Sequence, residues 1–153
     1  MRLGDFPGVL EELASQFSRP LARDAKRIDV LWLREDEVVA AFEVESTTSV
    51  FSGLLRLSDL LVLHPNAKIP LYIVAPRNRR DLVARQIGRP TFSRGLKNPL
   101  PKNCGYISFE KLRDFSDQVE RLGLAPLLLD NPERALNTVA EAFDTPRAEM
   151  VRD

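Results

Sequence analysis

Two glutamates lie close together on one predicted strand, and their spacing allows both to bind the same cation. The segment Val38–Glu45 has the sequence Val-Val-Ala-Ala-Phe-Glu-Val-Glu, whose apolar and β-branched composition predicts a strand. Because side chains alternate along a strand, Glu43 and Glu45 share one face with Val39 and Ala41. Two carboxylates in this apolar setting repel each other and are costly to bury. A hard cation such as Mg²⁺ between them would remove both costs, because it prefers oxygen ligands.

A third carboxylate, Asp29, is expected beside this pair. Residues 28–33 form another predicted strand, and the polar run 34–37 predicts a turn between the two strands. Asp29 and Glu43 are equally distant in sequence from Asp36, so antiparallel pairing places them opposite each other, within a slip of one residue. The alternative is an acidic sheet edge that is solvated and binds nothing. The apolar neighbours of the three carboxylates favour the metal site.

These carboxylates resemble the motif of the PD-(D/E)xK superfamily of restriction-type endonucleases. In this likeness Asp29 takes the place of the motif's Asp, Glu43 that of its Asp or Glu, and Glu45 that of its Lys. A Lys would orient the attacking water and offset developing negative charge, which a carboxylate cannot do. Glu45 therefore implies either a Glu-x-Glu version of the site, in which it binds metal or accepts a proton, or a loss of activity. The candidates for a displaced lysine are Lys26 and Lys68.

The resemblance covers Ile28 to Phe109, and the predicted helix before it matches the first core helix of the superfamily. It implies a restriction endonuclease-like fold and hydrolysis of nucleic-acid phosphodiester bonds, for which the superfamily suggests DNA; the sequence itself does not distinguish DNA from RNA. It also implies Mg²⁺ as cofactor, with Mn²⁺ as an alternative, and catalytic and metal-binding roles for Asp29, Glu43 and Glu45. A glutamate of the first helix often assists in this superfamily, and Glu12 or its neighbour Glu11 matches that role. Two rival functions remain: a nuclease-like module that binds nucleic acid without cutting it, and a metal-free protein-interaction or regulatory module.

The segment after Glu45 predicts a helix that extends to about Leu63 and begins at a cap residue within 46–48. At helical spacing its polar residues form a narrow stripe beside an apolar sector: Ser49, Ser52, Arg56 and Asp59. We expect Ser49, Ser52 and Arg56 to contact nucleic acid, although Arg56 and Asp59 are one turn apart and can instead pair. Gly53 in mid-helix costs about 1 kcal/mol relative to Ala, which predicts close packing against another element.

Charge is balanced overall but unevenly distributed. The chain has 22 Lys and Arg against 22 Asp and Glu, so there is no global attraction for a polyanion. Residues 76–102, however, hold eight basic residues and a single acid, Asp81. This basic segment is either a solvated helix face or a phosphate-contacting surface, for which Arg79, Arg80 and Arg85 are the candidates.

Hydrophobic periodicity predicts the element order α-β-β-α-β-α-β-α-α, which is an α/β fold with a mixed central sheet flanked by helices. The strand at 38–45, the helix after it and the strand at 71–74 predict a crossover between parallel strands. We expect residues 1–122 to form the nuclease-like domain and 123–153 a C-terminal helical extension. Its last helix begins at Pro132 and carries an apolar stripe through Phe143, which packs on the same domain or on a second copy. A homodimer is expected, because cutting both strands of a duplex calls for two sites.

The chain has one cysteine, Cys104, and one histidine, His64. These counts exclude an internal disulfide, a zinc site built from several thiolates and chemistry based on His pairs. We expect His64 at a helix end and Cys104 packed at a strand entry. No stretch predicts a membrane span or a signal peptide, so we expect a cytoplasmic protein with no membrane partner.

Overall fold

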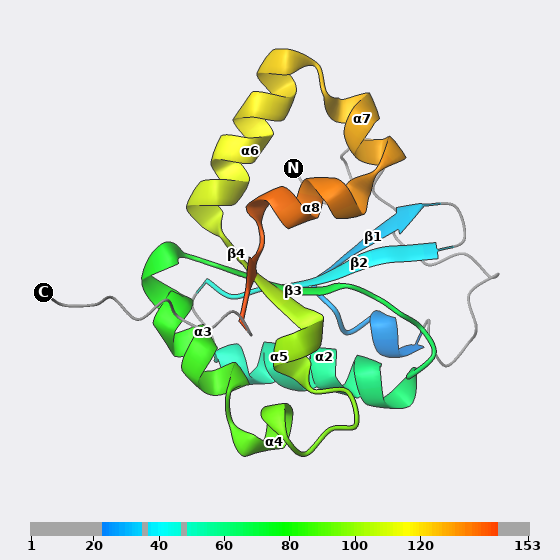
Figure 1. Ribbon diagram of the computed structural model, residues 1–153, viewed down its shortest axis with the longest axis vertical. Helices are drawn as coiled ribbons and strands as arrows, with labels where there is room; N and C mark the ends of the chain where they lie inside the picture. Colours follow the sequence, from blue (N-terminus) through cyan, green and yellow to red (C-terminus); the bar gives the residue numbers. More distant parts are fainter. Residues whose placement is uncertain (1–22, 35–36, 47–48, 144–153) are drawn as a thin grey trace, which may run out of the picture.

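The computed structural model describes residues 23–34, 37–46 and 49–143. In this part of the chain a mixed five-stranded sheet lies between two groups of helices, which confirms the predicted α/β fold (Figure 1). Glu11, Glu12 and the expected first helix lie outside the described residues.

The sheet has the strand order β1-β2-β3-β4-β5. The inner three strands, β2, β3 and β4, run parallel to one another, and β1 and β5 pair antiparallel at the two edges. The predicted crossover from the second strand to the third is therefore confirmed. The bounds are β1 (Val30–Arg34), β2 (Glu37–Val44), β3 (Leu71–Ala75), β4 (Cys104–Ser108) and β5 (Glu141–Ala142).

The hairpin of β1 and β2 has the register that brings Asp29 opposite Glu43. Val30 pairs with Phe42, and continuing this register by one residue gives Asp29 and Glu43. Nearer the turn, the register shifts at an irregularity between Trp32 and Leu33. Such a bulge lets one strand gain a residue without disturbing the pairing beyond it. The predicted antiparallel pairing of the two strands is confirmed.

Helices cover both faces of the sheet (Figure 1). The helices on one face are α2 (Val50–Leu63), the 3₁₀ helix η2 (Arg77–Arg79), α3 (Arg80–Ile87), α4 (Pro90–Ser93) and α5 (Leu100–Asn103). Those on the other face are α6 (Phe109–Leu122), α7 (Ala125–Asp130) and α8 (Pro132–Val139). The short helices α4 and α5 lie where we expected a loop. Each has proline in its first turn, where the ring's fixed φ suits a helix start.

The end of the described chain differs from the expectation of one helix with a stripe through Phe143. Helix α8 ends at Val139, and the extended backbone of Ala140 leads into β5. This strand pairs with β4, whose edge would otherwise be open. Phe143 therefore lies beyond the helix, and its ring centroid is 6.3 Å from that of Tyr106.

Alternation along β2 divides the core into two clusters. Ala41 packs with the α2 residues Leu54 and Leu57 on one face of the sheet. Ala40 and Phe42 pack with β3, β4 and α8 on the other face. The sharing of faces predicted from the sequence is confirmed for Ala41, Glu43 and Glu45, which lie on the α2 side. It fails near the turn, where the irregularity in the register brings Val38 onto the same side as Ala41.

The single histidine and cysteine occupy the expected places. His64 is the C-cap of α2, and its Nε2 lies 2.9 Å from Asp24 Oδ2. This hydrogen bond holds the pKa of Asp24 below its usual value. Cys104 opens β4 and is buried, and burial raises the pKa of its thiol. Among the described helices, none has the length and apolar character needed to cross a membrane.

Candidate active site

Two buried glutamates lie at the carboxyl end of β2. Glu43 is 0% exposed and Glu45, immediately after the strand, is 2% exposed. The backbone of Glu45 continues the sheet, since its N–H donates to the carbonyl of Val74 at 2.8 Å. Because β1 and β3 flank β2 and α2 covers this face, both carboxylates are enclosed. Their burial creates a strong demand for a compensating positive charge.

Gly53 allows α2 to lie directly against these glutamates. A Cβ at position 53 would collide with Oε1 of Glu45 and would lie 3.2 Å from Cβ of Glu43. The close packing predicted from a mid-helix glycine is confirmed. Its partner is the carboxylate pair itself, so Gly53 is part of the site's construction.

Arg56, one turn after Gly53 on α2, makes a two-point contact with Glu43. Its Nε lies 3.0 Å from Oε1, and its Nη2 donates to Oε2. Of the two partners expected for Arg56, the structure does not show Asp59, because Arg56 pairs with Glu43; contact with phosphate stays a prediction. Sequence spacing indicated that this helix has a polar stripe. It did not indicate that the stripe turns toward β2.

The electrostatics of Glu43 reflect opposing influences. Burial is the largest and raises the pKa of its carboxyl, while the hydrogen bonds from Arg56 lower it and the charge of Asp29 raises it. The net effect is a raised pKa. The pKa of Arg56 is also raised, chiefly by its hydrogen bonds to Glu43, with smaller contributions from the charges of Asp29 and Glu45. Three carboxylates therefore act on one guanidinium.

Asp29 forms the exposed side of the centre. Its Oδ2 accepts a hydrogen bond of 2.9 Å from the N–H of Val44, which holds the carboxylate beside the end of β2. In the described part of the chain, no three His, Cys, Asp or Glu side chains form a ready-made metal cage. Mg²⁺ does not require one, because one or two carboxylates usually hold it together with water and substrate phosphate. The donors Asp29 and Glu43 fit that pattern.

The predicted phosphate ligands of α2 lie at the same end of the sheet. Ser49 is the N-cap of the helix, Ser52 is in its first turn, and both are exposed. No acidic residue lies in that turn, so the partial positive charge of the helix start is not offset there. These features suit an anion next to the carboxylates.

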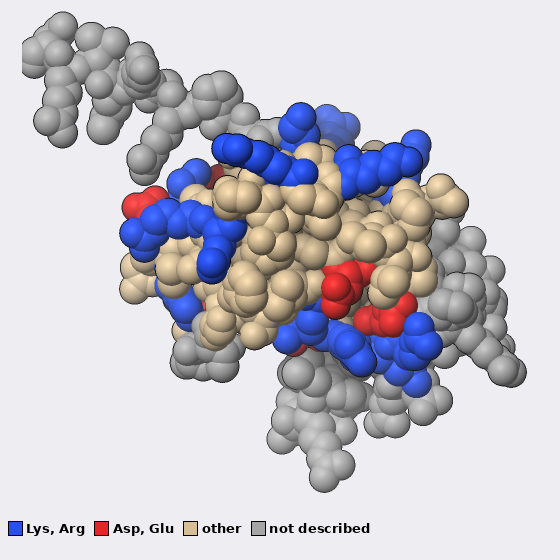
Figure 2. All heavy atoms as spheres, turned by 90° about the horizontal axis from the view of Figure 1, so that it is seen from below, with Lys and Arg blue, Asp and Glu red and all other residues tan. Residues whose placement is uncertain are grey.

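The basic segment has mixed surroundings. Helix η2, which holds Arg79, follows the carboxyl end of β3, the strand beside β2. Arg85 is exposed on α3, whereas Arg80 Nε lies 2.7 Å from Glu141 Oε2 and ties α3 to β5. Lys111 contacts the same glutamate at 3.1 Å. Figure 2, which looks onto the α2–α5 side, shows Lys and Arg spread around a largely uncharged face that also carries a few acidic side chains.

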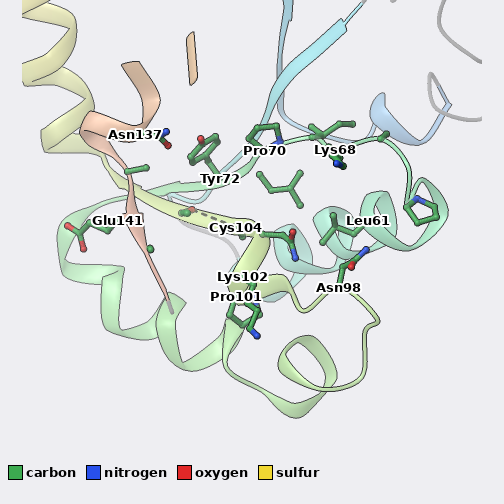
Figure 3. Close-up of a pocket in the computed structure, with 18 residues that line it drawn as sticks. Leu61, Lys68, Pro70, Tyr72, Asn98, Pro101, Lys102, Cys104, Asn137 and Glu141 are labelled. Atoms are coloured by element: carbon green, nitrogen blue, oxygen red, sulfur yellow. Dashed lines mark hydrogen bonds between the residues drawn. The ribbon is translucent and has the colours of Figure 1, made fainter. Parts of the chain in front are cut away.

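Neither candidate for a displaced lysine is seen at Glu43. Lys26 is exposed in the turn before β1. Lys68 is exposed and lines an open pocket of about 830 Å³ at the amino-terminal starts of β3 and β4 (Figure 3). Glu45 follows the carboxyl end of β2, at the opposite end of these parallel strands. The cation in contact with Glu43 is an arginine from the covering helix.

Comparison with known proteins identifies the family of this chain. A family model described as the C-terminal domain of Type II restriction enzyme NmeDI matches residues 3–134. The chain belongs to this family. Type II restriction enzyme NmeDI of Neisseria meningitidis serogroup C is 35% identical to it over 98 residues, which are 60% of this chain and 28% of that enzyme. The aligned region is thus well under half of the relative's length. No solved structure gives a significant match.

The NmeDI C-terminal domain match includes every residue of the carboxylate centre. It covers Asp29, Glu43 and Glu45 together with Gly53 and Arg56 of α2. It ends within α8, before β5 and its ion pairs with Arg80 and Lys111. The centre therefore lies inside the matched region of this family.

Proposed function

We propose that this chain carries a metal-dependent endonuclease centre that hydrolyses phosphodiester bonds of DNA, in a Glu-x-Glu variant of the PD-(D/E)xK motif. The observation that carries the proposal is the enclosure of Glu43 and Glu45 beneath Gly53, with Asp29 at their open side. Carboxylates buried in this way are expensive unless they bind a cation. Membership of a family named for a Type II restriction enzyme supports DNA as the substrate.

The residues divide the chemistry among them. Asp29 and Glu43 hold Mg²⁺, with Mn²⁺ as an alternative, because they present oxygen donors from two neighbouring strands. When bound, the cation polarises the scissile phosphate and lowers the pKa of a bound water. Glu45, which immediately follows β2, orients the attacking water and accepts its proton. In this assignment Glu45 accepts a proton from the water, whereas the lysine of the motif would supply a positive charge.

The DNA backbone lies along the carboxyl end of the sheet in this proposal. Ser49 and Ser52 at the start of α2 contact phosphate, and Arg79 and Arg85 extend the contact along η2 and α3. Arg80 contributes less, because Glu141 already engages its guanidinium. These contacts hold the backbone without reading bases, so they set affinity and position rather than sequence preference.

A second candidate function is DNA binding without cleavage. It is favoured by the replacement of the motif's lysine by Glu45, and by the match to only a C-terminal share of a longer restriction enzyme. In that case another part of a longer protein would cut, and this domain would hold the DNA. The two candidates differ in whether the purified chain cleaves by itself.

A cleavage assay with matched variants separates these functions. The chain is incubated with duplex DNA, single-stranded DNA and RNA in Mg²⁺, Mn²⁺, Ca²⁺ or a chelator. We expect cleavage of DNA in Mg²⁺ or Mn²⁺ that is lost in Asp29→Asn and Glu43→Gln. The control Asp117→Asn makes the same charge change on exposed α6, across the sheet, and should cleave normally. DNA binding without cleavage under every metal would support the second candidate. Cleavage that survives both site variants would refute the assignment of residues.

A further inference from the structure

Arg56 of α2 contacts the Glu43 carboxylate at both of its oxygens. Each oxygen of the fully buried Glu43 accepts a hydrogen bond from one guanidinium nitrogen of Arg56. A paired arginine of this kind binds as a planar fork, which is stronger and more directional than a single contact. Glu43 is thus neutralised by a cation that belongs to the chain.

We propose that this ion pair is the metal-free state of the centre, and that an entering divalent cation displaces Arg56 from Glu43 and releases its guanidinium to a phosphate group of the substrate. The inference rests on the proposed function, because it takes Glu43 as a metal ligand. It adds a positioning residue and a switch that the motif does not contain.

Geometry favours the exchange. The Arg56 fork already contacts both Glu43 oxygens, so a metal ion bound to either oxygen lies close to the guanidinium and repels it. Glu43 cannot move away, because it lies in β2 and is covered by α2 at Gly53. Arg56 can move, since 33% of its side chain is exposed and it lies on the rim of the centre.

Charge favours the exchange once a cation arrives. The charges of Asp29, Glu43 and Glu45 all act on the guanidinium of Arg56. A divalent cation brings twice the charge of arginine in a smaller volume, and hard oxygen donors prefer it. The displaced Arg56 keeps its full charge outside the carboxylate cluster.

The helix carries the released guanidinium toward the substrate. Arg56 is one turn from Ser52 and two turns from Ser49 along α2, and both serines are exposed at the phosphate-facing start of the helix. Arginine in this position suits a phosphate oxygen, because its fork matches two oxygens at once. Metal loading and phosphate capture are therefore coupled through one side chain.

Nuclear magnetic resonance of the unmodified chain tests the displacement. The Nε–H signal of Arg56, assigned by its loss in Arg56→Met, is followed during titration with Mg²⁺, which is diamagnetic. We expect a protected signal without metal, and a shift with loss of protection from solvent exchange as Mg²⁺ binds. An unchanged signal at Mg²⁺ concentrations that saturate a calorimetric titration would overturn the proposal. The same holds if no Mg²⁺ binds at all.

Metal affinity of variants tests the competition independently of cleavage. At pH 8 we expect Arg56→Met to bind Mn²⁺ about ten-fold more tightly than the unmodified chain, because no fork has to be displaced. Arg56→Lys keeps the charge but loses the two-point contact, so its affinity should also rise several-fold. Lys111→Met removes an ion pair with Glu141 near the far edge of the sheet, and should leave the affinity unchanged.

The outcomes separate this inference from the proposed function. Equal affinity in Arg56→Lys and the unmodified chain would mean that Arg56 acts only as a nearby charge, and would overturn the exchange. If the unmodified chain also cleaves DNA, that result supports the proposed nuclease function and refutes only the exchange. Tighter metal binding in both Arg56 variants without any cleavage supports the exchange and counts against the nuclease.

Discussion

The packing of α2 against the carboxylates makes Gly53→Ala the most informative single change in the fold. In an ordinary exposed helix, Gly→Ala stabilises by about 1 kcal/mol, because alanine has the higher helix propensity. At position 53 the new Cβ would collide with Glu45 Oε1 and lie 3.2 Å from Glu43 Cβ. Overpacking of this kind typically costs about 1–3 kcal/mol. We therefore expect the stabilisation to be lost and a net destabilisation of up to about 2 kcal/mol to take its place.

The two contacts differ in how they can relax. The Glu45 carboxylate is the end of a flexible side chain and can rotate, whereas Glu43 Cβ is fixed to the backbone of β2. Relief of the clash consequently moves either Glu45 out of place or α2 away from the sheet. Both movements disturb the proposed water-orienting group. We therefore expect the cleavage rate to fall even in conditions where the variant stays folded.

Urea unfolding followed by circular dichroism measures the stability change. Position 116 provides a matched control, since Ser116 is exposed in the middle of α6. The pair Ser116→Gly and Ser116→Ala reports the same glycine-to-alanine difference without a packing partner, and alanine should be favoured there by about 1 kcal/mol. If Gly53→Ala stabilises the chain as much as the control does, the carboxylates are not packed beneath α2 and the reasoning fails.

Four further results are expected. Glu45→Ala should abolish cleavage and leave DNA affinity nearly unchanged, because a group that acts on the attacking water affects rate rather than binding. Glu45→Lys should also lose activity. A gain of activity in Glu45→Lys would show that the natural chain has drifted from catalysis. Replacing Arg79 and Arg85 by Ala should flatten the dependence of DNA affinity on salt, since phosphate contacts release counterions. Arg80→Ala should change this salt slope less and should lower stability. Slopes equal to that of the unmodified chain in all variants would assign these arginines to a solvated face. The raised pKa of Glu43 means that the folded state holds its proton more tightly than the unfolded state, so stability is lost as pH rises through the folded pKa. Glu43→Gln should therefore gain stability relative to the unmodified chain between acidic and neutral pH in urea titrations without metal, and a difference that does not change with pH would contradict a raised pKa of Glu43. We also propose a homodimer, because cleavage of both duplex strands needs two centres, and light scattering should give twice the mass of the chain; a strict monomer at high concentration argues against it.

The hairpin and its carboxylates were predictable because strand periodicity is short and regular. Alternation along β2 placed Glu43 and Glu45 on one face, and antiparallel pairing placed Asp29 opposite Glu43. Each inference needed only neighbours on the same or the adjacent strand. The glycine in α2 was likewise interpretable, because its propensity cost requires a compensating contact that only packing could supply.

The partner of Arg56 could not be predicted, because it depends on how α2 is rotated against the sheet. A helical pattern shows which residues share a stripe but not which residue of a distant strand the stripe faces. Strand β5 was missed for a similar reason. Glu141 and Ala142 continue an apolar helical pattern, and only the open edge of β4, a tertiary feature, turns them into a strand. Arg80 and Lys111 then meet at Glu141, which explains part of the basic segment by structure rather than by substrate.

A crystal structure of the chain with Mn²⁺ and a short DNA duplex tests the central claim most directly, because Mn²⁺ is located by its anomalous scattering. We predict an anomalous peak in contact with the carboxylates of Asp29 and Glu43, with Arg56 withdrawn from Glu43 and directed at a phosphate. A structure at saturating Mn²⁺ with no peak at these carboxylates, and with Arg56 still paired to Glu43, would contradict the account.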